Sequence, residues 1–155
     1  MEFVPYTGRL GFSYANEYKR YFLIRNDVIS GCCSPPEYYL FDKETGKQKA
    51  NLGRVLYIDT NKNEPIIVKI TNSNYTDKTA KYTSITIHNI DTEKKYLIPL
   101  SANEIDNALN NAGEMYPEYL FEEPQLSNQE LKLRYIISRQ PLKKKTITIN
   151  LNKYR

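Results

Sequence analysis

Apolar and polar residues alternate over short stretches through most of the chain, which is the pattern of β-strands. In the run SITIHNI (84–90), Ile85 and Ile87 fall on one face of an extended backbone, while Thr86 and His88 fall on the other. This alternation predicts a half-buried strand, with one face in the core and the other in water.

Eight segments have the composition of strands, because they are rich in Ile, Val, Tyr, Phe and Thr. They are 19–29, 38–41, 54–58, 65–71, 82–90, 95–100, 130–138 and 145–151. The last of them alternates most cleanly, with Ile147 and Ile149 on one face and Thr146 and Thr148 on the other. Antiparallel pairing is expected because the connections between segments are short.

Three of these connections begin with an aspartate at the end of an apolar run. They are FDKETGK (41–47), IDTNKNE (58–64) and IDTEKK (90–95). Asp42, Asp59 and Asp91 are each predicted to open a type I turn, because an aspartate carboxylate can accept hydrogen bonds from the following backbone. Gly46 is predicted to take the left-handed conformation of a bulged hairpin. Successive hairpins of this kind predict an antiparallel meander.

The segment SANEIDNALNNAG has the pattern of one short helix, predicted over about 101–112. Ser101 and Glu104 have the spacing of a capping box, and Gly113 follows as the residue that ends the helix. The apolar residues between them recur at helical spacing, so the helix is expected to pack on a sheet.

The predicted fold class is mainly β: a single domain over residues 1–155, built as an antiparallel β-sandwich or a curled β-meander with one short α-helix. A brief strand is expected at YLF (119–121), and Lys143, Lys144 and Lys145 are expected to form a turn before the last strand.

The bulk composition is that of an ordinary globular protein. Of the 155 residues, 40% are hydrophobic and 26% are charged. The longest apolar runs, such as YFLI (21–24), are far shorter than the roughly 18 residues that cross a bilayer. The N-terminal segment lacks the apolar core of a signal peptide. A cytoplasmic location is therefore predicted, with the periplasm as the alternative if Met1 stands in place of a signal peptide.

The stretch VISGCCSPPEYY (28–39) raises the question of cysteine chemistry, because Cys32 and Cys33 are adjacent. A lipid-attachment site requires a continuous apolar stretch before the cysteine, and Arg25 and Asp27 interrupt it. A zinc site usually has four Cys or His ligands, and His88 is the chain's one histidine. The cysteines are therefore predicted to be small, partly buried residues before a turn, and no metal or cofactor is expected.

Charge is distributed unevenly along the chain. Residues 101–130 contain seven acidic residues and no Lys or Arg, so the rest of the chain must carry +11 to give the net charge of +4. Basic residues are concentrated after residue 131: Lys132, Arg134, Arg139, Lys143, Lys144, Lys145, Lys153 and Arg155. One interpretation is a solvated surface on which acidic and basic elements lie close together and compensate each other.

The other interpretation is a polarised surface that binds a partner. Tyrosines among the acidic residues are suitable anchors for a basic protein, such as a toxin or effector domain. The predicted partner-binding residues are Glu104, Asp106, Glu114, Tyr116, Glu118, Tyr119, Glu122 and Glu123. The basic C-terminal strands, with Tyr135 and Tyr154, leave open a nucleic-acid-binding β domain as the alternative.

Motifs for common catalytic chemistry are absent from the sequence. The six glycines form neither a P-loop nor a dinucleotide-binding fingerprint, and a single histidine removes most acid–base schemes. The protein is therefore predicted not to be an enzyme, and an enzyme of unrecognised type is kept as the second alternative.

The hairpins YYLFDKETGKQ and ITIHNIDTEKKYLIPL carry a family resemblance. In strand and turn style they resemble the small all-β immunity proteins of bacteria, and equally the blades of β-propellers. The resemblance to immunity proteins implies a stoichiometric inhibitor without chemistry of its own, which binds a toxin and covers its active site.

Overall fold

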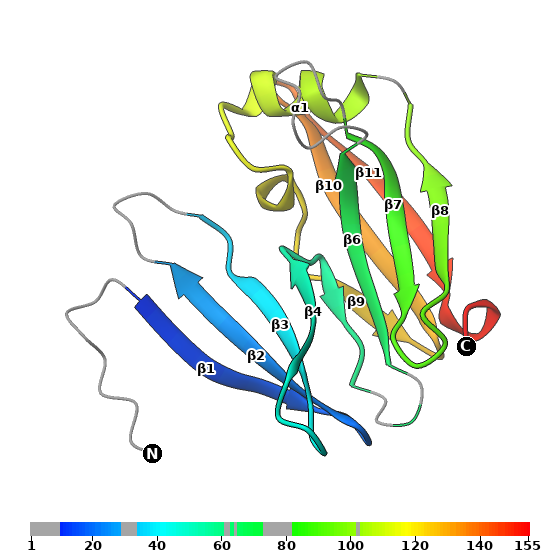
Figure 1. Ribbon diagram of the computed structural model, residues 1–155. Coiled ribbons are helices and arrows are strands. Elements are labelled where there is room, and N and C mark those ends of the chain that lie inside the picture. The colour runs from blue at the N-terminus through cyan, green and yellow to red at the C-terminus, as the bar shows by residue number, and fades with distance from the viewer. Residues whose placement is uncertain (1–9, 29–33, 61–62, 64, 73–81, 102) are drawn as a thin grey trace.

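The computed structural model describes residues 10–28, 34–60, 63, 65–72, 82–101 and 103–155. Within these ranges the chain forms three antiparallel sheets, one α-helix and two short 3₁₀ helices (Figure 1). Cys32 and Cys33, with the predictions made for them, lie outside the described residues.

The three sheets follow one another along the chain. The N-terminal sheet has the order β1-β2-β3-β4 and consists of β1 (Leu10–Glu17), β2 (Tyr21–Val28), β3 (Glu37–Asp42) and β4 (Gln48–Gly53). The central sheet has the order β5-β6-β7-β8 and consists of β5 (Tyr57–Ile58), β6 (Ile66–Asn72), β7 (Tyr82–Asn89) and β8 (Lys95–Pro99).

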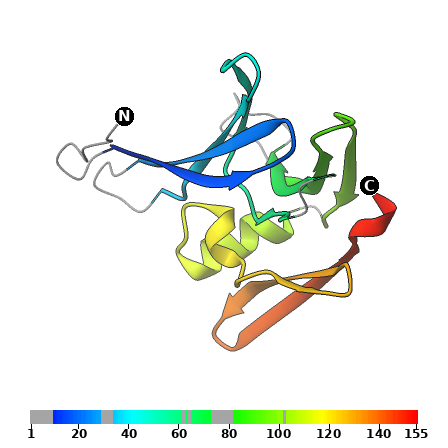
Figure 2. The same cartoon turned by 90° about the horizontal axis from the view of Figure 1, so that it is seen from below.

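The C-terminal sheet has the order β11-β10-β9 and consists of β9 (Gln125–Ser127), β10 (Glu130–Arg139) and β11 (Leu142–Asn150). The helical elements are α1 (Glu104–Ala112), η1 (Pro117–Leu120) and η2 (Leu151–Lys153). Seen from below, the three sheets occupy three separate sides of the molecule (Figure 2).

The predicted fold class, mainly β with antiparallel sheets and one short α-helix, is confirmed. Each of the eight predicted strand segments overlaps a strand of the structure. The strands β1, β4 and β9 were not predicted. The sequence of β4, QKANLG, lacks β-branched and aromatic residues, and β4 pairs with β3 because their hairpin brings it alongside.

The inner strands of the central sheet, β6 and β7, are largely buried on both faces, whereas β8 exposes one face. Ile66 and Val68 of β6 point into the larger core, which also contains residues of α1 and β10, while Ile67 points into a smaller core with Leu23 and Leu40. The prediction of a half-buried strand over 84–90 is therefore wrong: Thr86, on the face expected to be wet, is 3% exposed. The N-terminal sheet covers that side of the central sheet.

The C-terminal hairpin and α1 close the larger core. Leu131, Leu133 and Tyr135 of β10 are fully buried, and they pack with Ile105 and Ala108 of α1. Burying an aliphatic side chain of this size stabilises the fold by about 1.5–3 kcal/mol. The alternation predicted for the last strand is confirmed, because Ile149 is buried and Ile147 half-buried while Thr146 and Thr148 are exposed.

Turn chemistry follows the prediction at Asp42. The Asp42 carboxylate accepts hydrogen bonds from the backbone N–H groups of Glu44 (3.0 Å) and Thr45 (2.8 Å), and Gly46 has the predicted positive φ of 67°. These backbone hydrogen bonds hold the pKa of Asp42 below its usual value. The turn predicted after Asp59 includes residues 61, 62 and 64, which lie outside the described residues.

At the β7–β8 turn the aspartate prediction is wrong. The side chain of Asn89, two residues earlier, accepts the hydrogen bonds from the backbone N–H groups of Asp91 and Thr92, both at 3.1 Å. An asparagine side chain caps a turn in the same way as an aspartate, so the residue two positions upstream performs the predicted role.

Three further local predictions are corrected by the structure. The helix begins at Glu104 with Asn103 as its N-cap, not at Ser101. The Glu104 carboxylate accepts a hydrogen bond from the Tyr135 hydroxyl of β10 and also interacts with the Ser101 side chain. Gly113 ends the helix as predicted, with a φ of 67°. The segment 119–121 overlaps the 3₁₀ helix η1 and adds a single bridge to β10. The lysines at 143–145 lie inside β11, after a turn at residues 140–141.

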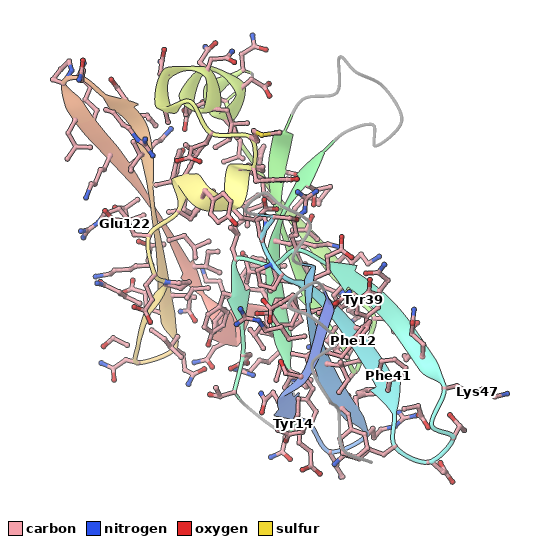
Figure 3. All side chains as sticks on the ribbon, turned by 90° about the vertical axis from the view of Figure 1, so that its left-hand side faces the viewer. Phe12, Tyr14, Tyr39, Phe41, Lys47 and Glu122 are labelled. Atoms are coloured by element: carbon pink, nitrogen blue, oxygen red, sulfur yellow. The ribbon has the colours of Figure 1, made fainter. Side chains whose placement is uncertain are left out.

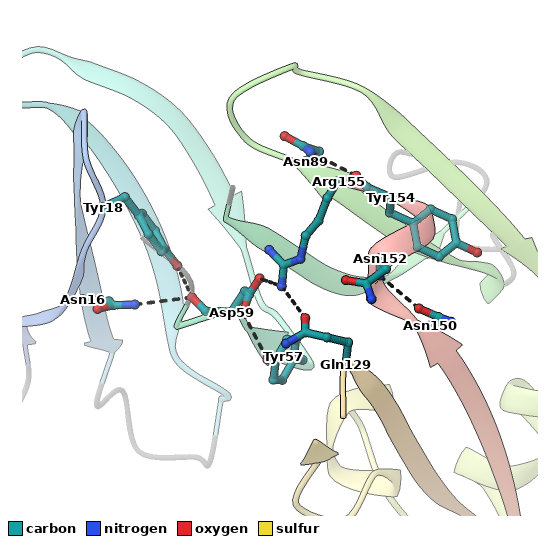
Figure 4. A network of polar contacts seen from close by, with 10 residues as sticks. All are labelled: Asn16, Tyr18, Tyr57, Asp59, Asn89, Gln129, Asn150, Asn152, Tyr154 and Arg155. Atoms are coloured by element: carbon teal, nitrogen blue, oxygen red, sulfur yellow. Dashed lines mark hydrogen bonds and ion pairs between the residues drawn. The ribbon is translucent and has the colours of Figure 1, made fainter. Parts of the chain in front are cut away.

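Asp59, the third predicted turn residue, forms a buried ion pair with Arg155 (Figure 4). Arg155 Nη2 lies 2.7 Å from Asp59 Oδ2, and the two side chains are 11% and 3% exposed. The same guanidinium donates to the Gln129 side chain at 3.0 Å, while the Tyr18 hydroxyl donates to the Asp59 backbone carbonyl at 3.0 Å. Segments from all three sheets therefore meet at one polar network.

We expect the substitution Arg155→Met to lower the free energy of unfolding by about 3 kcal/mol, because it leaves the Asp59 carboxylate buried without its cation. Urea unfolding at pH 7 measures the loss. The double substitution Asp59→Leu with Arg155→Met should recover most of it, and the neighbouring exposed Lys153→Met should change little. An equal loss in the Arg155 and Lys153 variants would contradict this account.

Candidate partner-binding surface

The outer side of the N-terminal sheet carries a group of aromatic side chains that we call the aromatic face. It consists of Phe12, Tyr14, Phe22, Ile24, Tyr39 and Phe41. Four of these residues, Phe12, Tyr14, Tyr39 and Phe41, are labelled in Figure 3. Phe12 is 50% exposed, Tyr14 60% and Phe22 38%.

Strand register explains why these side chains lie together. Tyr14 of β1, Ile24 of β2 and Tyr39 of β3 are directly paired across the sheet, so their side chains share one face. Phe22 pairs with Phe41 in the next row on that face. The residues between them in sequence, such as Leu23, point into the smaller core. The strand β2 therefore carries apolar side chains on both of its sides.

A hollow of about 400 Å³ lies within the aromatic face. Phe12, Phe22, Ile24 and Phe41 line it, and the β3–β4 turn closes one end with Gly46. An apolar hollow of this size accommodates one or two inserted aliphatic or aromatic side chains.

Polar groups beside the aromatic face are held by partners within the chain. The Lys43 ammonium forms an ion pair with Glu17 and lies 5.2 Å from the centre of the Phe22 ring. The Tyr39 hydroxyl donates to the Glu37 carboxylate at 2.8 Å, which raises the pKa of Tyr39. Hydrophobic contact, rather than charge, is therefore the main interaction that this face offers.

The predicted partner-binding residues lie elsewhere, and three of the acids pair with basic residues of the C-terminal hairpin. Lys145 Nζ lies 2.8 Å from Glu104, which also accepts a hydrogen bond from the buried Tyr135 hydroxyl. Arg139 lies 2.5 Å from Glu114. Figure 3 labels the third acid, Glu122, which lies apart from the aromatic face.

Glu122 pairs with two basic residues of the C-terminal hairpin. Lys144 forms an ion pair with one carboxylate oxygen, and Arg134 lies 3.6 Å from the other. The hydrogen bond from Lys144 holds the pKa of Glu122 below its usual value. For Glu104, burial raises the carboxyl pKa, but hydrogen bonds from Lys145 and Tyr135 outweigh it, so the net pKa is lowered.

The remaining predicted residues are divided between interior and surface. Asp106 and Glu118 each have one buried carboxylate oxygen without a hydrogen-bond partner among the described residues, and burial raises the pKa of Glu118. Tyr116 and Tyr119 contact each other edge to face with ring centres 6.1 Å apart, and Tyr119 is 41% exposed.

Glu123, the last of the predicted partner-binding residues, is exposed. The Arg54 guanidinium lies 4.7 Å from the centre of the Tyr116 ring. The eight residues thus follow one stretch of chain without forming one open acidic surface. The ion pairs support the interpretation that acidic and basic elements compensate each other, and the role of these residues in binding a partner stays a prediction.

Sequence reasoning missed the aromatic face. The alternation of Phe12 with Ser13 and of Tyr14 with Ala15 is a strand signal, but β1 was not predicted. In β2, the run YFLI (21–24) is apolar at every position, so periodicity does not distinguish its core side from its exposed side.

In the described part of the chain, His, Cys, Asp and Glu side chains nowhere gather in threes with the geometry of a metal site. None of the helices described there has the length and apolar character needed to cross a membrane.

Comparisons of the chain with protein-family models, with curated proteins and with solved structures find no match.

We expect Tyr135→Phe to lower the free energy of unfolding by about 1.5–3 kcal/mol at pH 7, because it removes a buried hydrogen bond to a charged carboxylate. This bond stabilises ionised Glu104, whose pKa is lowered in the folded state. The loss should therefore be full above the pKa of the unfolded chain and shrink as the pH falls through the folded-state pKa.

Urea unfolding of wild type and variant at pH 7 and pH 3 measures the loss in the free energy of unfolding and its dependence on pH. Tyr14→Phe, at an exposed position, is the matched control and should leave stability unchanged. A loss that is the same at both pH values would show that the Glu104 carboxylate is not involved.

Proposed function

We propose that this protein is a non-catalytic binding module that engages a protein partner through the aromatic face. The observation that carries the proposal is the exposure of Phe12 and Phe22 at an apolar hollow, with the exposed Tyr14 on the same side of the sheet. Contiguous exposed apolar surface on a folded chain is characteristic of interaction sites, and aromatic side chains are enriched in the centres of protein interfaces.

The chemistry of the face favours a protein over a nucleic acid. Lys43, the cation that lines the hollow, already pairs with Glu17, whereas binding to a phosphate backbone depends on cations that release counterions. The partner should therefore present a largely uncharged patch with one or two aliphatic or aromatic side chains that enter the hollow.

The basic C-terminal strands support the nucleic-acid alternative less well than their sequence suggests. Arg139 and Lys145 pair with glutamates of the 101–130 segment, and Arg134 and Lys144 share Glu122. To bind nucleic acid, these basic side chains would have to break an existing ion pair with a carboxylate and contact a phosphate in its place. The narrower prediction, an immunity-type inhibitor that covers the active site of a toxin, is one form of the proposed function.

Binding is tested with four immobilised baits incubated with lysate and secreted fraction of the source cells. They are wild type, Phe12→Asp in the aromatic face, Leu142→Asp as a remote control and Tyr119→Asp in the predicted acidic surface. Leu142 is 59% exposed, so its substitution adds the same charge at a similarly accessible apolar position. Circular dichroism and thermal unfolding confirm that each bait is folded.

We expect one protein to bind wild type, Leu142→Asp and Tyr119→Asp but not Phe12→Asp. The captured protein is then purified and titrated by calorimetry, where it should bind with one-to-one stoichiometry. Phe12→Asp should weaken the affinity about 30-fold or more, as expected when a central aromatic anchor is replaced. If the partner is a toxin, adding the wild-type protein should abolish its activity at equimolar ratio.

Three outcomes would overturn the proposal. If the Phe12 and Leu142 variants lose partner binding equally, the aromatic face is not the contact surface. If only Tyr119→Asp loses partner binding, the contact surface is the acidic segment. Concentration-dependent dimers in sedimentation, abolished by Phe12→Asp, would assign the face to a second copy of the chain. Recovery of nucleic acid, released steeply by moderate salt, would favour the nucleic-acid alternative.

A further inference from the structure

A second hollow, of about 350 Å³, lies where the inner side of the N-terminal sheet meets the β7–β8 hairpin. Leu40, Ala50 and Ile90 give it apolar walls. Polar side chains from three elements also line it: Lys49 of β4, His88 of β7, and Glu93 and Lys95 at and after the β7–β8 turn. It faces away from the aromatic face, because Leu40 points to the opposite side of β3 from Phe41.

Strand register gathers basic side chains on one face of the central sheet. His88 of β7 is paired with Ile67 of β6 on one side and with Lys95 of β8 on the other, so these three side chains share a row. Lys69 lies two residues beyond Ile67 and therefore points to the same side. Lys69 Nζ donates to the backbone carbonyl of Leu52 at 3.3 Å.

Positive charge exceeds negative charge around this hollow. Lys49 pairs with Glu93 at 2.6 Å, and Glu93 is the one carboxylate among the described residues that line the hollow. In the described part of the chain Lys95 has no ion pair, and Lys69 has a neutral carbonyl as its hydrogen-bond acceptor. Among the groups that line the hollow, Lys95 is therefore the cation without a carboxylate partner, and it lies next to His88. Lys69 does not line the hollow but points to the same side of the sheet.

His88 and Lys69 both have lowered pKa values, mainly because they are buried. Burial, followed by the charges of Lys95 and Lys69, lowers the pKa of His88 to about 4. Burial, followed by the charge of Lys95, lowers the pKa of Lys69. Glu93 acts on His88 in the opposite direction but more weakly. A bound anion would relieve the repulsion between these groups.

We propose that this hollow binds a small organic anion. Its phosphate or carboxylate group contacts Lys95 and His88, while its apolar part packs on Leu40, Ala50 and Ile90. Lys95 and His88 both line a partly enclosed hollow with apolar walls, so one ligand can contact polar and apolar groups together. The volume falls within the range of small-molecule sites and suits one aromatic ring or a short aliphatic chain.

The single histidine of the chain makes the site directly observable. The His88 imidazole resonances are followed by NMR at pH 7 and constant ionic strength during titration with phenyl phosphate, benzoate, inorganic phosphate or benzyl alcohol. We expect saturable shifts with phenyl phosphate or benzoate, weaker binding of inorganic phosphate, and no binding of the uncharged alcohol. The comparison of phenyl phosphate with benzoate identifies the preferred anionic group.

Two variants separate a specific site from general attraction to a basic protein. Lys95→Gln removes one proposed contact and should weaken phenyl phosphate binding about tenfold or more, as expected for loss of a charge-assisted hydrogen bond. Lys132→Gln removes the same charge from an exposed position on β10 and should leave the affinity unchanged. Bound phenyl phosphate should also raise the pKa of His88 from about 4 toward its ordinary value.

Shifts that rise linearly without saturation for every anion would overturn the proposal. So would equal weakening in the Lys95 and Lys132 variants, or a response to benzyl alcohol as large as that to phenyl phosphate. Proton spectra before ligand is added establish that each variant is folded. Because the aromatic face lies on the other side of the N-terminal sheet, failure here leaves the proposed partner binding unaffected.

Discussion

Burial of the inner strands of the central sheet, β6 and β7, on both faces is the constraint on which the rest of the structure depends. Ile66 and Val68 require cover on one side and Ile67 on the other, and each side is covered by a separate sheet. Each covering sheet has a second face that is not needed for the core. On the N-terminal sheet that free face is aromatic, while on the C-terminal hairpin it is polar and basic. The architecture thus determines where binding surfaces can lie.

Polar contacts fix the relative positions of these layers. Hydrophobic packing is non-directional, so two cores alone would allow the sheets to slide. The Asp59–Arg155 ion pair and the Tyr18 hydroxyl provide directional contacts at the point where the layers converge. At the opposite end, Glu104 and Glu114 attach the α1 segment to the C-terminal hairpin. Many of the unevenly distributed charges therefore form ion pairs that hold separate elements of the chain together.

Local chemistry explains what could be predicted from the sequence. Ile- and Val-rich runs indicated eight strands, and Gly46 and Gly113 indicated a turn and a helix end, because each signal lies within a few residues. Contacts between distant segments were beyond this reasoning. The alternation around Thr86 is typical of a solvent-exposed face, and only the distant sheet that covers it shows that it is buried. The partner of Asp59, Arg155, likewise lies far away in the sequence.

The same limit applied to the candidate site. Phe22 and Leu23 are neighbours of similar hydrophobicity, yet one is exposed and the other lies in a core, because a second layer covers one side of β2 only. The double-sided burial of β6 and β7 also has a consequence for folding. Their hairpin forms from nearby residues, but it remains an uncovered, isoleucine-rich ribbon until α1 and the C-terminal hairpin dock. During that interval the ribbon is the segment of the chain most exposed to intermolecular β-pairing and aggregation.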